Sequence, residues 1–166
     1  MRMRIIGVDP GLNRTGYAVI EDRGGRWVAV EGGIARTDPE ESLELRVLAI
    51  YRDIREVLEE LRPEAMALEE LHSNYEFPRT AILMGHARGA VCLAAAEFGI
   101  TVTGYAPSRV KNAVTGSGGA SKEQVQRAVV TQLGLASPPK PLDVTDAFAL
   151  AVCHAMVARS PVARVK

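Results

Sequence analysis

The sequence predicts a mixed α/β fold, in which a five-stranded sheet with antiparallel first three strands is flanked by helices. Three strand patterns come first, helix and strand patterns then alternate, and only helical patterns follow the fifth strand. That order favours a mixed sheet covered by helices. With 166 residues the chain can bury a sizeable core. We expect a single domain over residues 1–160 and a short basic tail at residues 161–166.

The first three strands are expected at residues 3–9, 15–21 and 26–35, where apolar and β-branched residues are frequent. The sequence "RGG" at residues 23–25 is typical of a hairpin turn, because glycine readily adopts the positive φ angles of such turns. These three strands are therefore expected to form an antiparallel meander.

An amphipathic helix is expected within residues 39–63. Its apolar residues recur three or four positions apart, acidic residues occupy its first turn, and Pro63 ends it. The remaining elements are a short buried strand, a helix rich in small residues, a fifth strand and three further helices, expected at residues 65–70, 79–99, 100–106, 107–115, 121–133 and 143–159. The glycines and alanines of the second helix make it a candidate dimer interface, although packing against the sheet is the competing explanation.

The overall charge and the cysteines limit the partners of the chain. It has 20 Lys plus Arg and 20 Asp plus Glu, so any nucleic-acid contact must come from local basic clusters. Cys92 and Cys153 lie in apolar helical settings without the spacing of a zinc site, which indicates core residues in a reducing compartment. No apolar stretch is long enough to cross a bilayer, and we therefore expect a cytoplasmic protein with no membrane partner.

Two carboxylates end apolar strands in matching positions. Asp9 closes the strand "RIIGVD", and Glu69 follows the apolar run "AMAL". A buried charge at such a place usually has a paired charge or a metal. Active sites in open α/β sheets favour strand ends, so two central strands can deliver both acids to one sheet edge. Glu70, beside Glu69, also allows the plainer interpretation that acids mark the return of the chain to solvent.

Two further acids, Asp143 and Asp146, stand three positions apart and are expected on one face of the last helix. The alternative for Asp143 is a helix N-cap. Together, the four carboxylates describe an all-oxygen site suited to magnesium or manganese. Two such ions about 3.5 to 4 Å apart can activate a water and stabilise the leaving oxygen in phosphodiester cleavage.

Five stretches of the sequence form a distinctive series. They read "IIGVDPGLNRTGYAVI", "ALEE", "MGHARGA", "YAPSRVKNAVTGSGGASKEQVQ" and "DVTDAFALAVCH", at residues 5–20, 67–70, 84–90, 105–126 and 143–154. In content and order they resemble the RuvC-type Holliday junction resolvases, and they extend over nearly the whole chain. The opening "DPG…TGY" and the "SRVK…GSGGASKEQVQ" block are much more specific than a count of carboxylates.

The resemblance implies an RNase H-like fold, a homodimer, and magnesium-dependent cleavage of four-way DNA junctions by paired symmetric nicks in recombination and repair. It implies two ions per active site, with manganese as an alternative to magnesium. The family's four catalytic, metal-binding acids are matched here by Asp9, Glu69, Asp143 and Asp146. The resemblance also implies a partnership with the RuvA-RuvB branch-migration complex.

Two lysines match family residues that contact the DNA backbone near the scissile phosphate. These are Lys111 and Lys122, and the plainer interpretation of both is a solvated surface lysine. Lys122 can also stabilise negative charge in the transition state. Folding can gather further basic residues around the acids, namely Arg79, Arg88, Arg109 and Arg127. Among these, we expect Arg79 to contact DNA.

One position departs from the family pattern. The family commonly has an aromatic residue three positions after the glutamate, where it can stack on unpaired junction bases, and here that position is His72. The loop that follows supplies Tyr75 and Phe77 instead, and stacking on a base is worth about 1 to 3 kcal/mol. Local loop packing is the alternative for both aromatics, and His72 is itself a candidate DNA contact. His86 and His154 lie in apolar helical runs and are expected to be packed or capping residues.

Three other functions share parts of these patterns. Sugar kinases and actin-like ATPases also open with a strand that ends in Asp and is followed by a glycine-containing hairpin, and "DPGLNRTGYAV" alone fits that pattern. These proteins need two such lobes, however, and no second copy is present. A YqgF-like RNA-processing nuclease shares the aspartate of the first strand, and the long match in residues 108–126 favours the resolvase. A non-catalytic junction-binding module is disfavoured by acids at all four positions.

Overall fold

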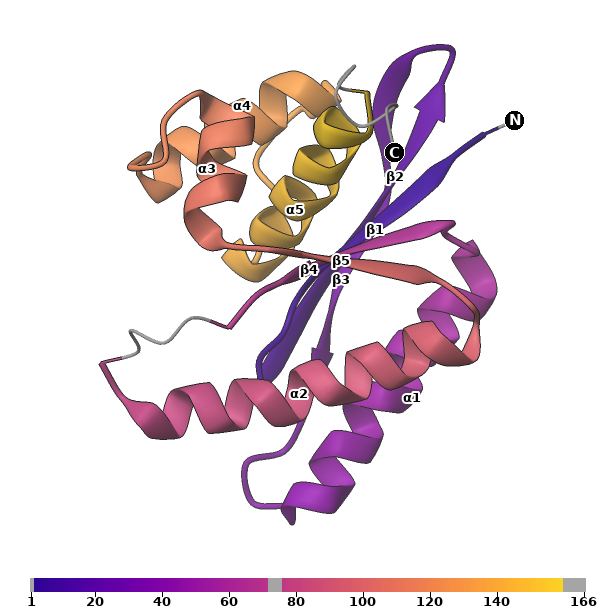
Figure 1. Cartoon of the computed structure of the whole chain (residues 1–166), viewed down its shortest axis with the longest axis vertical. Helices are drawn as coiled ribbons and strands as arrows, with labels where there is room; N and C mark the ends of the chain where they lie inside the picture. The colour runs from indigo at the N-terminus through magenta and orange to yellow at the C-terminus, as the bar shows by residue number, and fades with distance from the viewer. Residues whose placement is uncertain (1, 72–75, 160–166) are drawn as a thin grey trace.

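The computed structural model describes residues 2–71 and 76–159, and these contain one five-stranded sheet with helices on both sides (Figure 1). The strands are β1 (Arg4–Asp9), β2 (Arg14–Arg23), β3 (Arg26–Arg36), β4 (Ala65–Glu69) and β5 (Thr101–Tyr105). The helices are α1 (Leu43–Leu61), α2 (Pro78–Glu97), α3 (Pro107–Thr115), α4 (Lys122–Leu133) and α5 (Leu142–Arg159). Every strand and helix expected from the sequence is present, with bounds that differ by a few residues.

The strand order in the sheet is β3-β2-β1-β4-β5. Strands β1, β2 and β3 pair antiparallel, which confirms the expected meander, whereas β4 runs parallel to both β1 and β5. The turn between β2 and β3 contains Gly24 and Gly25, whose φ angles of 65° and 90° are readily adopted by glycine. Strands β1 and β4, which end in Asp9 and Glu69, are therefore neighbours in the middle of the sheet.

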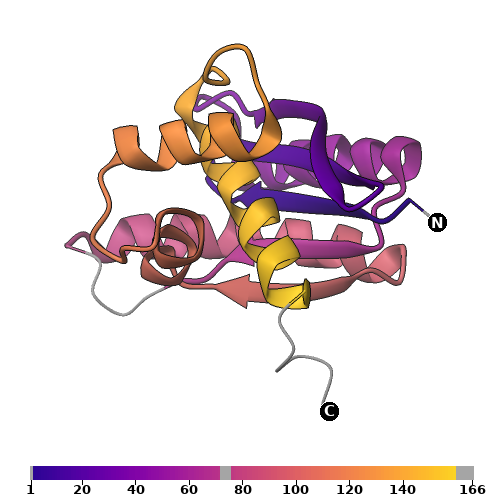
Figure 2. The same ribbon diagram turned by 90° about the horizontal axis from the view of Figure 1, so that it is seen from above.

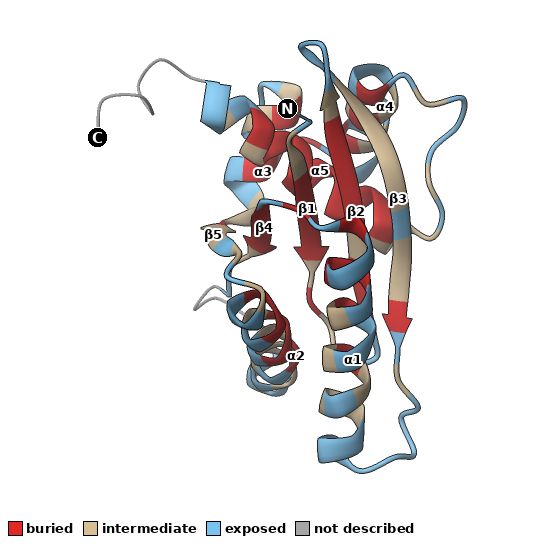
Figure 3. Ribbon diagram, turned by 90° about the vertical axis from the view of Figure 1, so that its right-hand side faces the viewer, coloured by how far each residue is buried: buried red, intermediate tan, exposed pale blue. Residues whose placement is uncertain are grey.

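Helices cover the two faces of the sheet in two layers. Helices α1 and α2 pack on one face, and α3, α4 and α5 lie on the other (Figure 1). Ile6 and Val8 of β1 belong to the core under α1 and α2, whereas Ile5 belongs to the core under α5. Figure 3 shows that the buried residues concentrate on the central strands and on the helix sides that face them. Successive side chains of β1 therefore serve opposite cores, as the period of two in a strand requires.

Helix α5 crosses the sheet against β1 and β2 (Figure 2). Its backbone lies so close that a Cβ atom on Gly7 would be 2.0 Å from the carbonyl oxygen of Ala147. A Cβ atom on Gly16 would be 2.4 Å from the carbonyl oxygen of Asp143. These two glycines therefore allow the close contact that brings the start of α5 next to the end of β1.

Two details refine the expectations for helix ends. Helix α1 begins only at Leu43, so Glu44 is the acid of its first turn, whereas Glu40 and Glu41 precede the helix. Asp38 holds them in a turn, because its Oδ1 accepts a hydrogen bond from the Glu40 amide at 2.9 Å and its carbonyl oxygen accepts one from the Glu41 amide at 3.1 Å. Asp143 is not an N-cap, since it lies within the first turn of α5.

Three further expectations concern the ends, the hydropathy and the cysteines of the chain. The basic tail at residues 161–166 lies outside the described residues. No helix in the part of the chain that the structure describes is long and apolar enough to span a membrane. Cys153 is buried, Cys92 is half-buried, and both are free, which agrees with their expected place in the core.

Candidate active site

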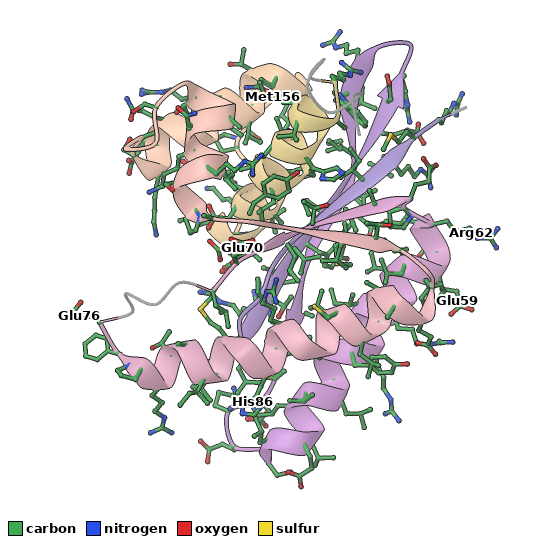
Figure 4. All side chains as sticks on the ribbon, in the orientation of Figure 1. Glu59, Arg62, Glu70, Glu76, His86 and Met156 are labelled. Atoms are coloured by element: carbon green, nitrogen blue, oxygen red, sulfur yellow. The ribbon has the colours of Figure 1, made fainter. Side chains whose placement is uncertain are left out.

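Two acids reach the same place from neighbouring strands. Asp9 and Glu69 are the last residues of the parallel strands β1 and β4. Ile5 and Ala67, which precede them by an even number of positions, belong to the core beneath α5. Because side chains alternate between the faces of a sheet, Asp9 and Glu69 both project toward α5. Glu70 projects to the opposite face, where its carboxylate lies over β5 (Figure 4), so this neighbour is not part of the site.

A cavity of about 290 Å³ is lined by Asp9, Glu69 and Asp146. Asp146 reaches it from α5, close to the start of that helix. The other lining residues come from α3, α4 and α5 and are Pro107, Val110, Lys111, Lys122, Val125, Ala149 and Leu150. Three acids from distant parts of the sequence thus share one concave site with two lysines and an apolar wall.

The acids in this cavity resist ionisation. Burial, repulsion from Glu69 and a hydrogen bond with Glu69 raise the pKa of Asp9 to about 8, although Lys122 acts in the opposite direction. Burial and repulsion from Asp9 raise the pKa of Asp146 to about 6. Burial also raises the pKa of Glu69. In the absence of a bound cation, the cavity therefore retains protons near neutral pH.

Asp143 lies beside this cavity instead of lining it. Its Oδ2 is 3.7 Å from Nε of Arg14, and its charge still raises the pKa values of Asp9 and Asp146. It lines an adjoining pocket of about 330 Å³ that includes Arg14 and Thr80. The structure therefore brings three of the four expected acids together and holds the fourth nearby, next to an arginine.

The donor chemistry of the cavity fits a hard divalent cation. Such ions prefer carboxylate oxygens, and a cation relieves the repulsion that raises the pKa values of Asp9 and Asp146. Within residues 2–71 and 76–159, no three Asp, Glu, His or Cys side chains are gathered closely enough to hold a metal ion. The carboxylates of this cavity are therefore not gathered around a common point in this structure, although Asp9 and Glu69 lie close enough to shift each other's pKa.

Lys111 of α3 and Lys122 of α4 both line the cavity. Lys122 is the first residue of α4, which begins with a capping box. Ser121 Oγ accepts a hydrogen bond from the Gln124 amide at 3.2 Å, and the Ser121 amide donates to Oε1 of Gln124 at 2.7 Å. This box fixes the first turn of α4. Both lysines lower the pKa of Asp146, so their charges act inside the cavity.

The remaining residues expected to contact DNA are more widely spread. Phe77 is 66% exposed just before α2, and Arg79 is exposed in the first turn of that helix. Neither is among the described residues that line the cavity. His72 and Tyr75 lie outside the described residues.

The expected gathering of basic residues around the acids occurs only in part. Arg109 stacks on Tyr105, with its guanidinium carbon 5.4 Å from the ring centroid. Arg127 is exposed on α4. Arg88 comes from α2, on the opposite face of the sheet, and its Nε donates a hydrogen bond to the carbonyl oxygen of Glu69 at 3.1 Å. Among the expected basic residues that the structure describes, only the two lysines line the cavity.

The two helical histidines differ from each other. His154 is half-buried, and its Nδ1 is 2.9 Å from the hydroxyl of Tyr105, as expected for a packed residue. His86 is exposed on α2 (Figure 4), so the expectation that it is packed is wrong. The apolar run around His86 is misleading because only one side of α2 faces the sheet.

Sequence reasoning missed the contacts of two arginines beside the acids. Arg14 lies within "DPGLNRTGY" and Arg88 lies within "MGHARGA", and neither stretch indicates a partner. Arg14 meets Asp143, and Arg88 meets the backbone of Glu69. Each contact joins segments that are distant in the sequence, so it depends on tertiary packing that no local pattern encodes.

The strand order and the acidic cavity at the ends of β1 and β4 are those of an RNase H-like nuclease. The sequence profile of the family described as "Crossover junction endodeoxyribonuclease RuvC" matches residues 5–154. The chain belongs to this family of endonucleases, which depend on a metal for activity.

Two relatives with the same description are similar over nearly their whole length. The protein of Rhodopirellula baltica is 48% identical over 158 residues, which are 95% of this chain and 89% of that protein. The protein of Desulforamulus reducens is 44% identical over 164 residues, which are 99% of this chain and 100% of that protein.

Solved structures of Thermus thermophilus RuvC have the same fold and are 39% identical in sequence. One covers 95% of this chain and 96% of that chain with a TM-score of 0.87. The other, a complex with a Holliday junction substrate, covers 95% of each chain with a TM-score of 0.89. A yeast mitochondrial Holliday junction resolvase, 12% identical over 93% of this chain and 78% of its own, shares the fold with a TM-score of 0.67.

Proposed function

We propose that this chain resolves four-way DNA junctions by paired symmetric nicks, through divalent-metal-assisted hydrolysis of phosphodiester bonds in recombination and repair. The observation that carries the proposal is the cavity in which Asp9, Glu69 and Asp146 meet and in which the pKa values of these acids are raised. Family membership supports the reaction class, and the junction-bound structure of the T. thermophilus relative supports the substrate.

The proposed cofactor is magnesium, replaceable by manganese, with two ions per active site. Asp9, Glu69 and Asp146 are the proposed ligands, and Asp143 joins them when its carboxylate turns away from Arg14. Bound ions of this kind supply an activated water and neutralise charge on the leaving oxygen. The chain's own contribution is to hold Asp9, Glu69 and Asp146 in one cavity, with Asp143 beside it.

The two lysines of the cavity have a separate proposed role. A DNA phosphate that enters the cavity approaches carboxylates of like charge, and Lys111 and Lys122 offset that repulsion. Lys122 is also placed to stabilise the negative charge that develops on the phosphate during cleavage.

The exposed residues around the start of α2 are proposed as contacts to the junction itself. Phe77 is suited to stacking on an unpaired base, and Arg79 to a backbone phosphate. On the basis of the sequence alone, His72 and Tyr75 are proposed as further DNA contacts in the loop that precedes α2.

A homodimer with one site per protomer accounts for paired nicks in a junction with two-fold symmetry. The outer face of α2 supports this proposal. Ile82 and Leu93 are 63% and 62% exposed, and with the exposed His86 and Gly89 they follow spacings of four and three residues. Two helices pack side by side through such a pattern. By family resemblance, we extend the proposal to junctions presented by the RuvA-RuvB branch-migration complex.

Cleavage of a labelled four-way DNA junction tests the proposal. The wild-type protein should nick two opposing strands in magnesium and neither strand in EDTA. Asp146→Asn should bind the junction with unchanged affinity and fail to cleave it, because the substitution removes a metal ligand and no DNA contact. Asp53→Asn on α1 is the matched control and should cleave like the wild type. Cleavage by Asp146→Asn in magnesium would remove Asp146 from the mechanism.

The same assay separates the alternative functions. Cleavage of structured RNA in preference to the junction would favour the YqgF-like reading and contradict the proposal. Tight junction binding without nicks in any divalent metal would indicate that the chain is a non-catalytic binding module. Nicks confined to one strand of each junction would contradict the symmetric dimer.

A further inference from the structure

The end of β4 is held in different ways on its two sides. Toward β5, Glu69 pairs with Tyr105, and the amide of Glu70 donates to the carbonyl oxygen of Tyr105 at 3.0 Å. Toward β1, the register of paired residues ends with Val8 and Leu68. The ladder between the two central strands therefore stops just before the two acids.

Arg88 holds the peptide group at this point. Its Nε donates a hydrogen bond at 3.1 Å to the carbonyl oxygen of Glu69, the residue directly beyond the last ladder pair. A hydrogen bond to that oxygen fixes the plane of the peptide that follows Glu69. The direction in which the Glu69 side chain leaves the backbone depends on this plane, so the contact acts on the carboxylate through the backbone.

Helix α2 fixes Arg88 in turn. Ala87, Ala90 and Val91, which flank Arg88 along α2, are buried in the core beneath the sheet. Arg88 itself is half-buried. The anchor of the hydrogen bond is thus a packed part of the helix, and its position is set by the core.

The charge of Arg88 has a smaller role than its position. Lys122 lowers the pKa of Asp9 and Lys111 lowers the pKa of Glu69, but Arg88 is not among the charges that shift either value. Arg88 lies on the α2 side of the sheet, whereas the carboxylates project toward α5. An electrostatic role in the cavity therefore does not explain the contact, and a geometric role does.

We propose that Arg88 is a positioning residue that orients Glu69 for divalent-metal binding by holding its backbone carbonyl from the opposite face of the sheet. The inference rests on the proposed function, because it assumes that Asp9 and Glu69 share a metal. Groups that orient metal ligands from outside the coordination sphere typically contribute about 10- to 100-fold to metal affinity or activity. Since Arg88 acts through the backbone, we expect the lower end of that range.

Titration of the DNA-free protein with Mn²⁺ at pH 8, followed by calorimetry, tests the proposal without relying on cleavage. Arg88→Met should weaken Mn²⁺ binding about tenfold. Arg88→Lys, which keeps a donor on a flexible stem, should restore part of the affinity. Arg55→Met is the control, because Arg55 forms its ion pairs with Glu59 and Glu97, which do not line the cavity. This control should bind Mn²⁺ like the wild type.

Cleavage kinetics supply a second readout that loss of fold stability would not imitate. Arg88→Met should need about tenfold more Mg²⁺ for half-maximal cleavage. At saturating Mg²⁺ its rate should approach that of the wild type, and its junction affinity should be unchanged. Circular dichroism checks the fold, and Arg88→Ala, which favours helix, provides the same test if the methionine variant is unfolded.

Asp9→Asn separates failure of this inference from failure of the proposed function. If Asp9→Asn loses Mn²⁺ binding and folded Arg88 variants bind like the wild type, the positioning role is overturned and the metal site stands. If Asp9→Asn binds Mn²⁺ like the wild type, the proposed metal site itself is overturned. Weaker junction binding by Arg88→Met with unchanged Mn²⁺ affinity would make Arg88 a DNA contact and also overturn the inference.

Discussion

Carboxylates at the two ends of the β1–β2 pair show opposite behaviour. At one end, Glu21 is 1% exposed, and its two oxygens accept hydrogen bonds from Nε of Arg4 and Nε of Arg23, each at 2.8 Å. These bonds hold the pKa of Glu21 below its ordinary value. At the other end lies Asp9, and Asp146 reaches the same cavity from α5. Burial and mutual repulsion raise the pKa values of these two acids to about 8 and about 6.

The difference lies in the cations that the fold provides. Arg4 also donates to the carbonyl oxygen of Leu61 at 2.7 Å, so the Glu21 cluster joins β1, β2 and the end of α1. Within residues 2–71 and 76–159, neither Asp9 nor Asp146 forms an ion pair. The buried carboxylate of Glu21, which is paired with arginines, therefore supports the fold. The buried carboxylates of Asp9 and Asp146, which have no such partner, are available to a cation from solution.

Matched amide substitutions at the two ends should give the largest contrast. Glu69→Gln should lower single-turnover cleavage by at least about 100-fold, because loss of a metal ligand costs no less than loss of a group that orients one. Its stability should not fall, since the substitution removes repulsion. Glu21→Gln should lower the free energy of unfolding, because two arginines lose their carboxylate, yet cleave normally while folded. Urea unfolding and cleavage assays check both variants, and a Glu69→Gln protein that unfolds as readily as Glu21→Gln would remove the contrast.

Junction binding at the cavity with Asp9 and Asp146 should depend strongly on salt concentration. Junction affinity should fall at least tenfold between low and moderate salt, because contacts with phosphates release counterions. Fluorescence anisotropy with a labelled junction measures the slope. A flat response would contradict backbone contacts by Lys111, Lys122 and Arg79.

Removal of Lys122 should make the carboxyl groups of Asp9 and Asp146 still harder to ionise. Lys122 lowers the pKa values of Asp9 and Asp146, so Lys122→Met should move the acidic limb of the cleavage-pH profile to higher pH. We expect a severalfold loss of rate at neutral pH that is partly recovered at higher pH. Lys140→Met, in the exposed loop before α5, is the control, and an unmoved limb in Lys122→Met would separate this lysine from the acids.

The smallest expected effect is a shift of the melting temperature. An aspartate whose pKa is raised from 3.8 to about 8 stays protonated in the folded protein while the unfolded chain is ionised. Between about pH 4 and pH 8 the folded protein holds more protons, so its metal-free stability should fall as pH rises. Magnesium should restore stability at pH 8, by about 3 to 5 °C at ten times its Kd, and add little at pH 5. An equal shift at both pH values would contradict competition between metal and protons.

Local patterns were sufficient for the parts of the fold that local physics determines. The Gly24-Gly25 turn, the alternation along β1 and the apolar spacing of α1 each appear in the sequence, and each element lies where it was expected. The positions of Asp9 and Glu69 followed as well, because both are fixed by strand ends and by a period of two.

The rest of the site depends on contacts between distant segments. Asp143 shares a helix with Asp146, but its pairing with Arg14 could not be predicted, because it arises only when α5 packs over Gly16. The exposure of His86 depends on which side of α2 meets the sheet. The resemblance to a known family supplied the four acidic positions together, whereas the residues alone left each of them ambiguous.

Diffraction from crystals soaked in manganese tests the central claim most directly. If the acids without an arginine form the cation site, an anomalous peak should lie between the carboxylates of Asp9 and Glu69, within reach of Asp146, and none beside Glu21. The peak should disappear in Asp9→Asn. A manganese ion bound elsewhere, or no ion at these carboxylates at pH 8, would contradict the account.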